Sequence, residues 1–256
     1  MTAEAKPVCT DKDRVLILCS RGVLTRTRHL MKDFKDLMPH TRSESKFEKS
    51  CKLTDINEMA ELAHCTRAMY FENRKKRDSY LWLSDVRGGA SVKFLILNIH
   101  TMQELRMTGN CLKGSRPLLS FDPQFDSEPH LQLVKEIFKH TFKTPQYLPK
   151  SKPFIDHVFN FSLTADGRIW FRNFQLVGKG EELQEVGPRM VLEVIKIFGG
   201  SFEGEVLYDN EKYVSPNEQR RELRLASMNK IAVRMSKKSK MERKLREEES
   251  LEEDSD

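Results

Sequence analysis

The sequence predicts a mixed α/β fold, because segments with the period of a strand alternate with segments with the period of a helix. Arg14–Cys19 contains the apolar run Val-Leu-Ile-Leu, which is typical of a buried strand. The helix that follows is predicted to end near Met38, before Pro39, with Leu30 and Phe34 on its inward face. Further strands are predicted at Ala68–Glu72, Ser79–Asp85, Val92–Ile99, Phe154–Phe161, Arg168–Val177 and Gly187–Phe198. Further helices are predicted after Thr54 and over Thr101–Met107 and Glu128–Phe142.

Composition indicates a soluble globular core with a heavily charged remainder. Of the 256 residues, 38% are hydrophobic and 32% are charged. No apolar run approaches the roughly 20 residues that a membrane-spanning helix needs. Residues Met1–Thr10 do not contain the apolar region of a signal peptide. We therefore expect no membrane contact and a nuclear or cytosolic location.

The reactive residue types do not form a catalytic or metal-binding pattern. The five cysteines are widely spaced without a Cys-x-x-Cys pair, which indicates reduced, mostly buried thiols. None of the seven histidines has ligand-like spacing from a cysteine, and His157, in a strand-like run, is typical of a core histidine. No nucleophile elbow, dinucleotide fingerprint or kinase signature occurs. The sequence therefore suggests no active site, no metal, no cofactor and no small-molecule substrate.

Charge is distributed unevenly along the chain. The net charge is +6, but Glu247–Asp256 carries seven acids and no base, so the residues before it carry +13. Lys237–Arg246, directly before the acidic end, carries six bases and one acid. A charge of this size favours a polyanionic partner. We expect the acidic end to compete with such a partner for the neighbouring basic block.

Residues 109–122 read Gly-Asn-Cys-Leu-Lys-Gly-Ser-Arg-Pro-Leu-Leu-Ser-Phe-Asp, with no helical or strand period. A structureless connection of this length is uncommon in a compact domain and is usually functional or disordered. Its apolar content argues against disorder. We expect four of its side chains to be buried anchors: Leu112, Leu118, Leu119 and Phe121. Lys113 and Arg116 would then lie at the surface on either side of Gly114, where backbone amides between two cations suit a phosphate.

A P-loop is the alternative for this segment, since Gly109 and Gly114 have its spacing. After the second glycine, however, Ser115 and Arg116 stand where Lys and Ser/Thr are required. Pro117 also opposes the helix that should begin there. The segment is therefore not a P-loop.

The same residues resemble a hallmark of the Brix-domain ribosome-biogenesis proteins, and five other segments resemble that family. They are Tyr-Leu-Trp-Leu-Ser at 80–84, Lys-Ser-Lys-Pro-Phe-Ile-Asp-His-Val at 150–158, Ile-Trp-Phe-Arg-Asn-Phe-Gln at 169–175, Gly-Pro-Arg-Met-Val-Leu at 187–192 and Leu-Tyr-Asp-Asn at 207–210. The matches span about 14–217. Arg87 and Ala90 depart from the pattern, because the family favours prolines at these positions.

The resemblance implies an α/β Brix domain of two similar halves, each like an anticodon-binding domain, at about 14–107 and 108–210. An N-terminal arm over 1–13 would precede it, and a charged tail over 211–256, helical or disordered, would follow. The resemblance also implies a non-enzymatic nucleolar factor in maturation of the large (60S) ribosomal subunit. The implied partners are pre-rRNA, the pre-60S particle and other assembly factors, including a helical homologue of the Epstein–Barr nuclear antigen-binding protein.

Twelve residues are candidate RNA contacts: Arg21, Arg26, Arg28, Lys113, Gly114, Arg116, Arg168, Arg172, Arg189, Lys237, Lys238 and Lys240. The first three lie at a predicted helix start, which favours anions. From the residues alone, a solvated basic helix start is the favoured alternative. The last three fit nucleic-acid binding, nuclear import or a solvated tail.

Strand alternation should place Arg168, Trp170 and Arg172 on one face of a strand. Aromatic rings interleaved with arginines can stack bases and pair phosphates. The alternative for Trp170 and Phe174 is a sheet buried on both faces, with the arginines at its rim. Arg189 either faces the central loop or a ligand, or is a buried structural arginine.

Three functions are compatible with these observations. The first is an RNA-binding assembly factor, and the second is a nucleolar protein–protein scaffold whose charge serves import and solubility. The third is a nucleotide-using enzyme, which only the rejected P-loop interpretation would support. Salt-dependent RNA binding separates the first two, and nucleotide turnover would revive the third.

Overall fold

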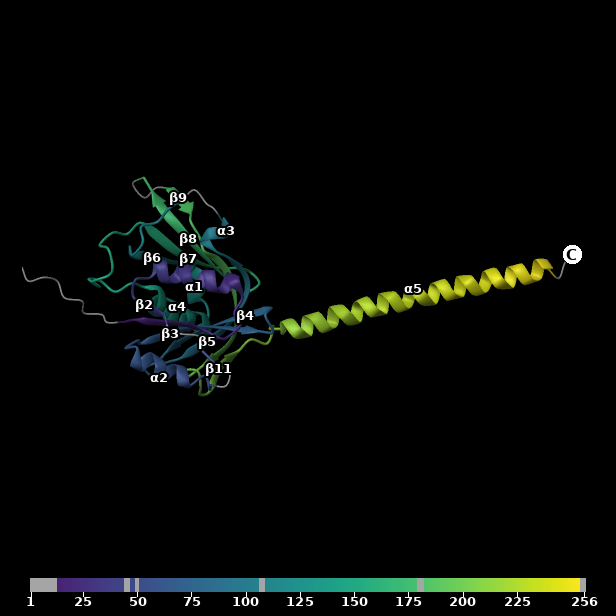
Figure 1. Cartoon of the computed structure of the whole chain (residues 1–256), viewed down its shortest axis with the longest axis horizontal. Helices are drawn as coiled ribbons and strands as arrows, with labels where there is room; N and C mark the ends of the chain where they lie inside the picture. Colours follow the sequence, from purple (N-terminus) through teal and green to yellow (C-terminus); the bar gives the residue numbers. More distant parts are fainter. Residues whose placement is uncertain (1–12, 44–46, 49–50, 106–108, 179–181, 254–256) are drawn as a thin grey trace, which may run out of the picture. The chain divides into compact units, whose positions relative to one another are not determined.

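The structure, a computed structural model, describes residues 13–43, 47–48, 51–105, 109–178 and 182–253 (Figure 1). The chain divides into two compact units, residues 1–210 and 211–256. The expected N-terminal arm, with Cys9, lies outside the described residues apart from Asp13.

The first part of the chain begins with β1 (Val15–Cys19), which is buried throughout as its apolar run predicts. In α1 (Thr25–Leu37), the buried residues recur at helical spacing, including Leu30 and Phe34. The elements that follow are β2 (Thr41–Ser43), α2 (Asp55–Leu62), β3 (Arg67–Arg74), β4 (Asp78–Asp85), β5 (Ser91–His100) and the short α3 (Met102–Leu105).

The second part begins with β6 (Pro117–Phe121) and a 3-10 turn, η1 (Pro123–Asp126), at whose start Asp122 accepts a hydrogen bond from the N–H of Gln124. The helix α4 (Pro129–Phe142) has proline in its first turn, where the missing N–H costs nothing. The strands that follow are β7 (His157–Leu163), β8 (Ile169–Val177), β9 (Glu182–Glu185), β10 (Arg189–Phe198) and β11 (Val206–Asp209).

The described strands form one eleven-stranded sheet with the order β2-β1-β3-β4-β5-β10-β8-β7-β6, to which β11 adds at β10 and β9 at β8. The series β1-α1-β3-β4-β5 recurs as β6-α4-β7-β8-β10. In each series the first strand is parallel to the second, and the later pairs are antiparallel. These series are the two similar halves. Their last strands, β5 and β10, pair with each other, so both halves share one sheet.

The main core is an aromatic cluster between this sheet and the two helices α1 and α4, which lie next to each other (Figure 1). Phe34 of α1 lies 5.6 Å from Phe171 of β8, measured between ring centroids. Phe138 of α4 lies 5.6 Å from Phe94 of β5. Each helix therefore packs on a strand of the other half. Phe142, in contact with both Phe34 and Phe171, joins the two sets of contacts.

The opposite face of the first half is covered by α2. Ile56 and Ala60 of this helix pack in a second core with Leu16, Tyr70 and other residues of β1, β3 and β4. At the end of this core the ring of Trp82 stacks on Phe198 at 5.7 Å.

Residues 109–122 are not a structureless loop, because 117–121 form the edge strand β6, parallel to β7. The run Pro-Leu-Leu-Ser-Phe lacks the sequence signals of a strand, because it begins with proline and contains two adjacent leucines. Proline is nevertheless tolerated at the start of an edge strand. Alternation turns Leu119 and Phe121 toward the core and Leu118 away from it. Two of the four expected anchors are therefore wrong: Leu112 and Leu118 are 43% and 46% exposed.

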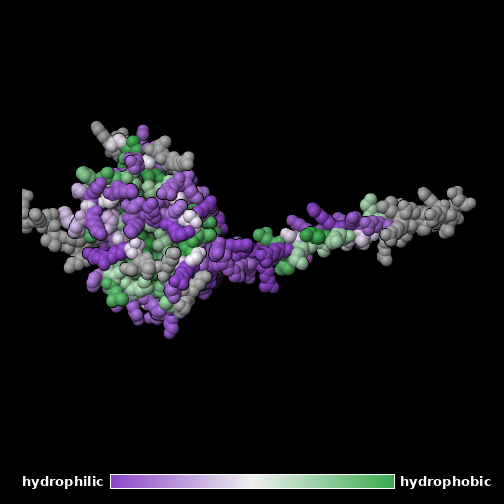
Figure 2. All heavy atoms as spheres, in the orientation of Figure 1, coloured by the Kyte–Doolittle hydropathy of each residue, from purple (hydrophilic) through white to green (hydrophobic). Residues whose placement is uncertain are grey.

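The second unit contains α5 (Pro216–Glu253), a helix of 38 residues. Leu225, Met228 and Met235 of this helix are exposed. Figure 2 shows a hydrophilic first part of the helix, followed by a stretch in which hydrophobic and hydrophilic residues are mixed. The described part of the acidic block continues the helix that contains the basic block. The expected competition of the acidic end with a polyanionic partner stays a prediction.

The shared aromatic core predicts a large effect of one ring. Phe171→Ala should lower the free energy of unfolding by about 3–5 kcal/mol, because it leaves a cavity beneath both helices. Leu118→Ala, at an exposed position, should change it by about 0.5 kcal/mol or less. Urea denaturation of both variants checks this, and a loss below about 1 kcal/mol for Phe171→Ala would contradict the proposed packing.

Candidate nucleic-acid interface

The exposed side of α1 carries a row of bases. Arg28, Lys32 and Lys35 follow one another at intervals of four and three residues, which places them on one face of the helix. All three are exposed, while Leu30 and Phe34 are buried on the other side. Of this row, only Arg28 is among the residues predicted from the sequence. The helical spacing of Lys32 and Lys35 is a signal that could have identified them as well.

Two further arginines lie at the N-terminal end of α1. Arg21 pairs with Glu48 and Arg26 with Glu104, each at 3.0 Å and with the arginine about two-thirds exposed. The first turn has no acidic residue, and Leu24 at the N-cap offers no side-chain hydrogen bond. Free N–H groups at a helix start favour an anion. Exposed ion pairs contribute only about 0–1 kcal/mol, so a phosphate can replace either carboxylate.

Lys113 joins this surface at the other end of α1. Its ammonium lies 3.4 Å from the carboxylate of Asp36, in the last turn of the helix, and its side chain is 79% exposed. The central loop therefore adds a base to the helix surface. We define the α1 basic face as Arg21, Arg26, Arg28, Lys32, Lys35 and Lys113.

Asp156 holds the central loop in place. One of its carboxylate oxygens accepts the N–H of Leu112 at 2.5 Å, and the other accepts the hydroxyl of Ser115. The carbonyl oxygen of Gly114 accepts the N–H of Lys152 at 2.7 Å. Gly114 has a φ of +80°, and a Cβ there would lie 3.3 Å from a backbone oxygen. The turn itself therefore requires this glycine.

Arg116 forms hydrogen bonds beside the same loop, whereas the side chain of Lys113 is exposed. The backbone N–H of Arg116 donates to the carbonyl oxygen of Phe154 at 3.0 Å, and its guanidinium donates to the carbonyl oxygen of Pro153 at 3.4 Å. Its Nε is buried without a hydrogen-bond partner among the described residues. Arg116 therefore contributes to the structure of the loop as well as to its charge.

Ser115, Asp156 and His157 have the composition of a catalytic triad but not its arrangement. Ser115 Oγ lies 3.0 Å and Asp156 Oδ1 lies 2.7 Å from the same ring nitrogen, His157 Nδ1. In a catalytic triad the two partners bind opposite ring nitrogens. Here His157 Nε2 is buried, without a partner among the described residues, and Ser115 is fully buried. This cluster fixes the loop and presents no nucleophile.

The environment of this cluster shifts two pKa values downward. Burial lowers the pKa of His157, although the Asp156 carboxylate opposes the shift. Burial alone would raise the pKa of Asp156, but hydrogen bonds from Ser115, His157 and the Leu112 N–H together hold it below its ordinary value. The folded protein therefore favours a neutral imidazole beside an ionised carboxylate.

These shifts predict how stability depends on pH. A group whose pKa is lower in the folded than in the unfolded protein stabilises the fold above its unfolded pKa and loses that contribution as pH falls. For His157 the loss begins below its ordinary pKa of 6.5. The melting temperature should therefore fall between pH 7.5 and 5, and His157→Asn should make this fall shallower. His100→Asn, at an exposed position, is the matched control. An equally steep fall in both variants would contradict the role of His157.

The face of β8 that points away from α1 and α4 forms a second candidate surface. Ile169 and Phe171 are buried toward the helices, whereas Trp170, Arg172 and Phe174 are half-buried on the other face. The guanidinium of Arg172 lies 4.8 Å from the centroid of the Trp170 ring, a cation–π contact. The predicted alternation is confirmed, and Trp170 is not buried on both faces. We call these three residues with Arg168 and Arg189 the open sheet face.

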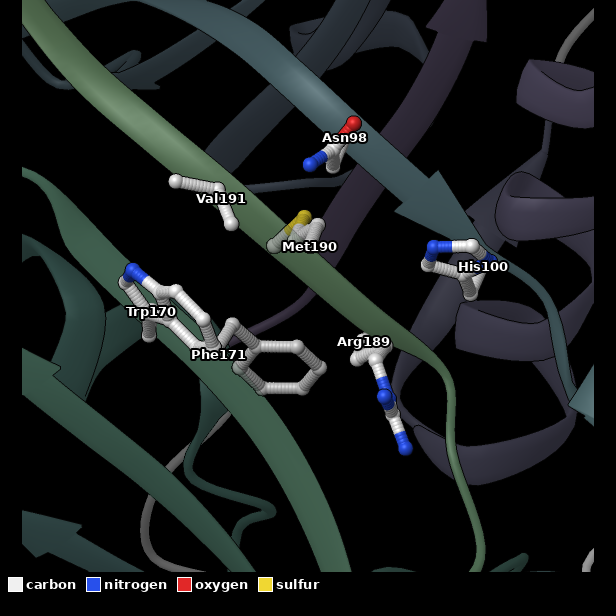
Figure 3. A pocket seen from close by; sticks show the side chains of 7 residues that line it. All are labelled: Asn98, His100, Trp170, Phe171, Arg189, Met190 and Val191. Atoms are coloured by element: carbon white, nitrogen blue, oxygen red, sulfur yellow. The ribbon is translucent and has the colours of Figure 1, made fainter.

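A small cavity of about 100 Å³ lies at this face between β5, β8 and β10 (Figure 3). Its lining includes Asn98, His100, Trp170 and Arg189. Arg189 forms a two-pronged ion pair with Glu185, at 2.7 and 2.9 Å. Ligand pockets usually measure about 300–1,000 Å³. A nucleobase would therefore stack on this surface rather than enter it.

The remaining predicted bases lie apart from both surfaces or at their edges. Arg168 is exposed at the end of the open sheet face, 3.9 Å from Asp166. Lys237, Lys238 and Lys240 are exposed on α5, in the second unit. The structure therefore brings the predicted residues of the first unit into two groups rather than one site. Among the described residues no three potential metal ligands gather, and no helix is long and apolar enough to cross a membrane.

These features define a duplicated α/β domain with one basic helix face and one open sheet face. The chain belongs to the Brix domain family, whose sequence model matches residues 20–196. It is 53% identical over 238 residues to the ribosome biogenesis protein BRX1 homolog of Caenorhabditis elegans, covering 93% of this chain and 68% of the relative. It is 52% identical over 247 residues to the protein of that name in Homo sapiens, covering 95% and 69%. The chain thus spans about two thirds of the length of these relatives.

A solved structure also matches this chain. It is a probable ribosomal biogenesis protein from Aeropyrum pernix K1, with a TM-score of 0.49 and 17% sequence identity. The match covers 70% of this chain and 95% of that one.

Proposed function

We propose that this protein is a non-enzymatic assembly factor that binds pre-rRNA during maturation of the large (60S) ribosomal subunit. The observation that carries the proposal is the α1 basic face, with four bases on α1, one in the turn before it and one in the central loop. The names of the relatives support a role in ribosome biogenesis. The large-subunit stage and a nucleolar location rest on the family resemblance of the sequence motifs.

The two surfaces suit different parts of an RNA. The α1 basic face offers exposed cations to backbone phosphates, which supply most of the affinity of RNA-binding proteins and no sequence specificity. The open sheet face offers an indole ring with an arginine stacked on it, which suits an unpaired base. We infer that phosphates dominate binding and that the open sheet face adds contacts to single-stranded segments.

Protein partners are part of the same proposal. Pre-60S particles contain other assembly factors, and we retain a helical homologue of the Epstein–Barr nuclear antigen-binding protein as the proposed direct partner. A scaffold function is the second candidate, and one observation favours it. Leu118, Phe154 and Ile155 are exposed near the edge strand β6, with Phe154 61% exposed. An apolar surface at a sheet edge is typical of a protein interface.

Salt dependence of RNA binding tests the proposal. If six or more phosphates are bound, affinity for a structured rRNA fragment should fall about a thousandfold between 50 and 200 mM salt. Arg28→Gln with Lys32→Gln should weaken binding and lower the slope of log affinity against log salt by about 1.5, since two contacts are lost. Fluorescence anisotropy with labelled RNA measures both quantities.

The matched control removes two bases outside the α1 basic face, with Lys52→Gln and Lys196→Gln, and should change the slope little. Affinity that barely responds to salt would reject the RNA-binding function and favour the scaffold. An equal loss of slope in both double variants would show that net charge, not the α1 basic face, binds RNA.

A further inference from the structure

The β3–β4 hairpin ends in a turn made of four consecutive bases, Arg74, Lys75, Lys76 and Arg77, all exposed. The N–H of Arg77 donates to the carbonyl oxygen of Arg74 at 3.1 Å. Lys75 and Lys76 have φ angles of +50° and +53°. Positive φ at both central residues is the mark of a type I′ turn.

Lysine is a poor residue for both central positions of this turn. Asn-Gly is the sequence that a type I′ turn favours, because a left-handed conformation costs most other residues about 1–2 kcal/mol each. Strained backbone of this kind persists at functional sites, where another requirement outweighs local stability. The charge is also unneutralised. Among the described residues no ion pair involves Lys75, Lys76 or Arg77, whereas Arg74 pairs with Glu72 at 2.7 Å.

A cavity of about 440 Å³ adjoins the turn, and Arg74 and Lys75 form part of its wall. Its lining also includes the aromatic rings of Phe47 and Tyr70, which lie 5.5 Å apart between centroids. The volume falls within the range of about 300–1,000 Å³ that is usual for ligand pockets. This cavity is therefore large enough to enclose a small planar group.

We propose that the β3–β4 turn and the adjoining cavity bind an unpaired nucleotide of RNA. The flanking phosphates contact Lys75, Lys76 and Arg77, and the base enters the cavity. Glu48 and Glu72 in the wall disfavour a phosphate inside it, which assigns the interior to the uncharged base.

This site is continuous with the α1 basic face. Glu48 lines the cavity and also forms the exposed ion pair with Arg21 at the start of α1. One RNA can therefore place phosphates along α1 and an unpaired base beside the β3–β4 turn. The inference rests on the proposed RNA-binding function and adds to it a second site with a defined kind of ligand.

The test uses the full chain and an RNA hairpin with a single bulged adenosine, compared with the same hairpin without the bulge. The wild-type protein should bind the bulged RNA more tightly than the paired one. Lys75→Gln with Lys76→Gln should weaken this binding on the order of tenfold at low salt, as expected for two lost phosphate contacts. Lys139→Gln, on α4, with Lys143→Gln, at the C-cap of that helix, removes the same charge and should leave the preference for the bulge intact.

A second double variant separates the effect of the two lysines on RNA binding from their effect on the stability of the turn. Lys75→Asn with Lys76→Gly should weaken RNA binding as much as the glutamine pair does, yet raise the melting temperature, because Asn-Gly fits the type I′ turn. An unchanged or lower melting temperature would overturn the argument from strain.

Substitution of a residue in the cavity lining tests whether the base enters the cavity. Cys51→Phe, at an exposed position in the lining, should remove the preference for the bulged RNA while leaving affinity for the paired hairpin unchanged, and Cys51→Ser should change neither. Equal wild-type affinity for bulged and paired RNA would overturn the proposed nucleotide site.

If the variant with Lys75→Gln and Lys76→Gln binds RNA normally while the variant with Arg28→Gln and Lys32→Gln does not, the nucleotide site is wrong but the proposed function stands. If the wild-type protein binds neither RNA, the proposed function itself fails.

Discussion

The contact on which the rest of the structure depends is the packing of each helix on a strand of the other half. Phe34 meets Phe171 across this boundary, and Phe138 meets Phe94. Aromatic pairs at such distances add about 0.5–1.5 kcal/mol beyond the apolar area that they bury. Together with the pairing of β5 and β10, these contacts give both halves one core and one sheet. The duplication seen in the topology therefore does not produce two separate domains.

The proposed interface follows from this core. Burial of Leu30 and Phe34 fixes the rotation of α1, so Arg28, Lys32 and Lys35 must face solvent. Asp156 fixes the central loop through Leu112 and Ser115, and Lys113 then reaches the last turn of the same helix. The bases of the α1 basic face are thus held by elements of both halves. A rigid arrangement of this kind reduces the ordering cost of binding a structured RNA.

Much of the fold could be predicted from the sequence, because its strong signals are local. The apolar run of β1, the stripe of α1 and the alternation of β8 each specify their own element. The edge strand β6 was missed because edge position tolerates proline and an exposed leucine. The pairing of β5 with β10 joins residues 89 to 107 positions apart, and no local pattern encodes it. Of the interface, the arginines at the start of α1 could be read from the sequence. Lys32 and Lys35 could be found only by assigning the residues of the helix to its exposed and buried faces. The hydrogen bond from Ser115 to Asp156 joins residues distant in the sequence and could be found only from the fold.

The two tryptophans offer the most direct test of the shared core, because Trp82 lies on β4 of the first half and Trp170 on β8 of the second. Trp170→Phe leaves Trp82 as the fluorescent probe, and Trp82→Phe leaves Trp170. Urea unfolding of each variant, followed by fluorescence and by far-ultraviolet circular dichroism, asks whether the two halves unfold together. A single shared core predicts that within each variant the tryptophan signal and the circular dichroism of the globular unit give the same midpoint and slope. A tryptophan transition displaced from the circular dichroism transition in either variant, with one half melting before the other, would contradict it.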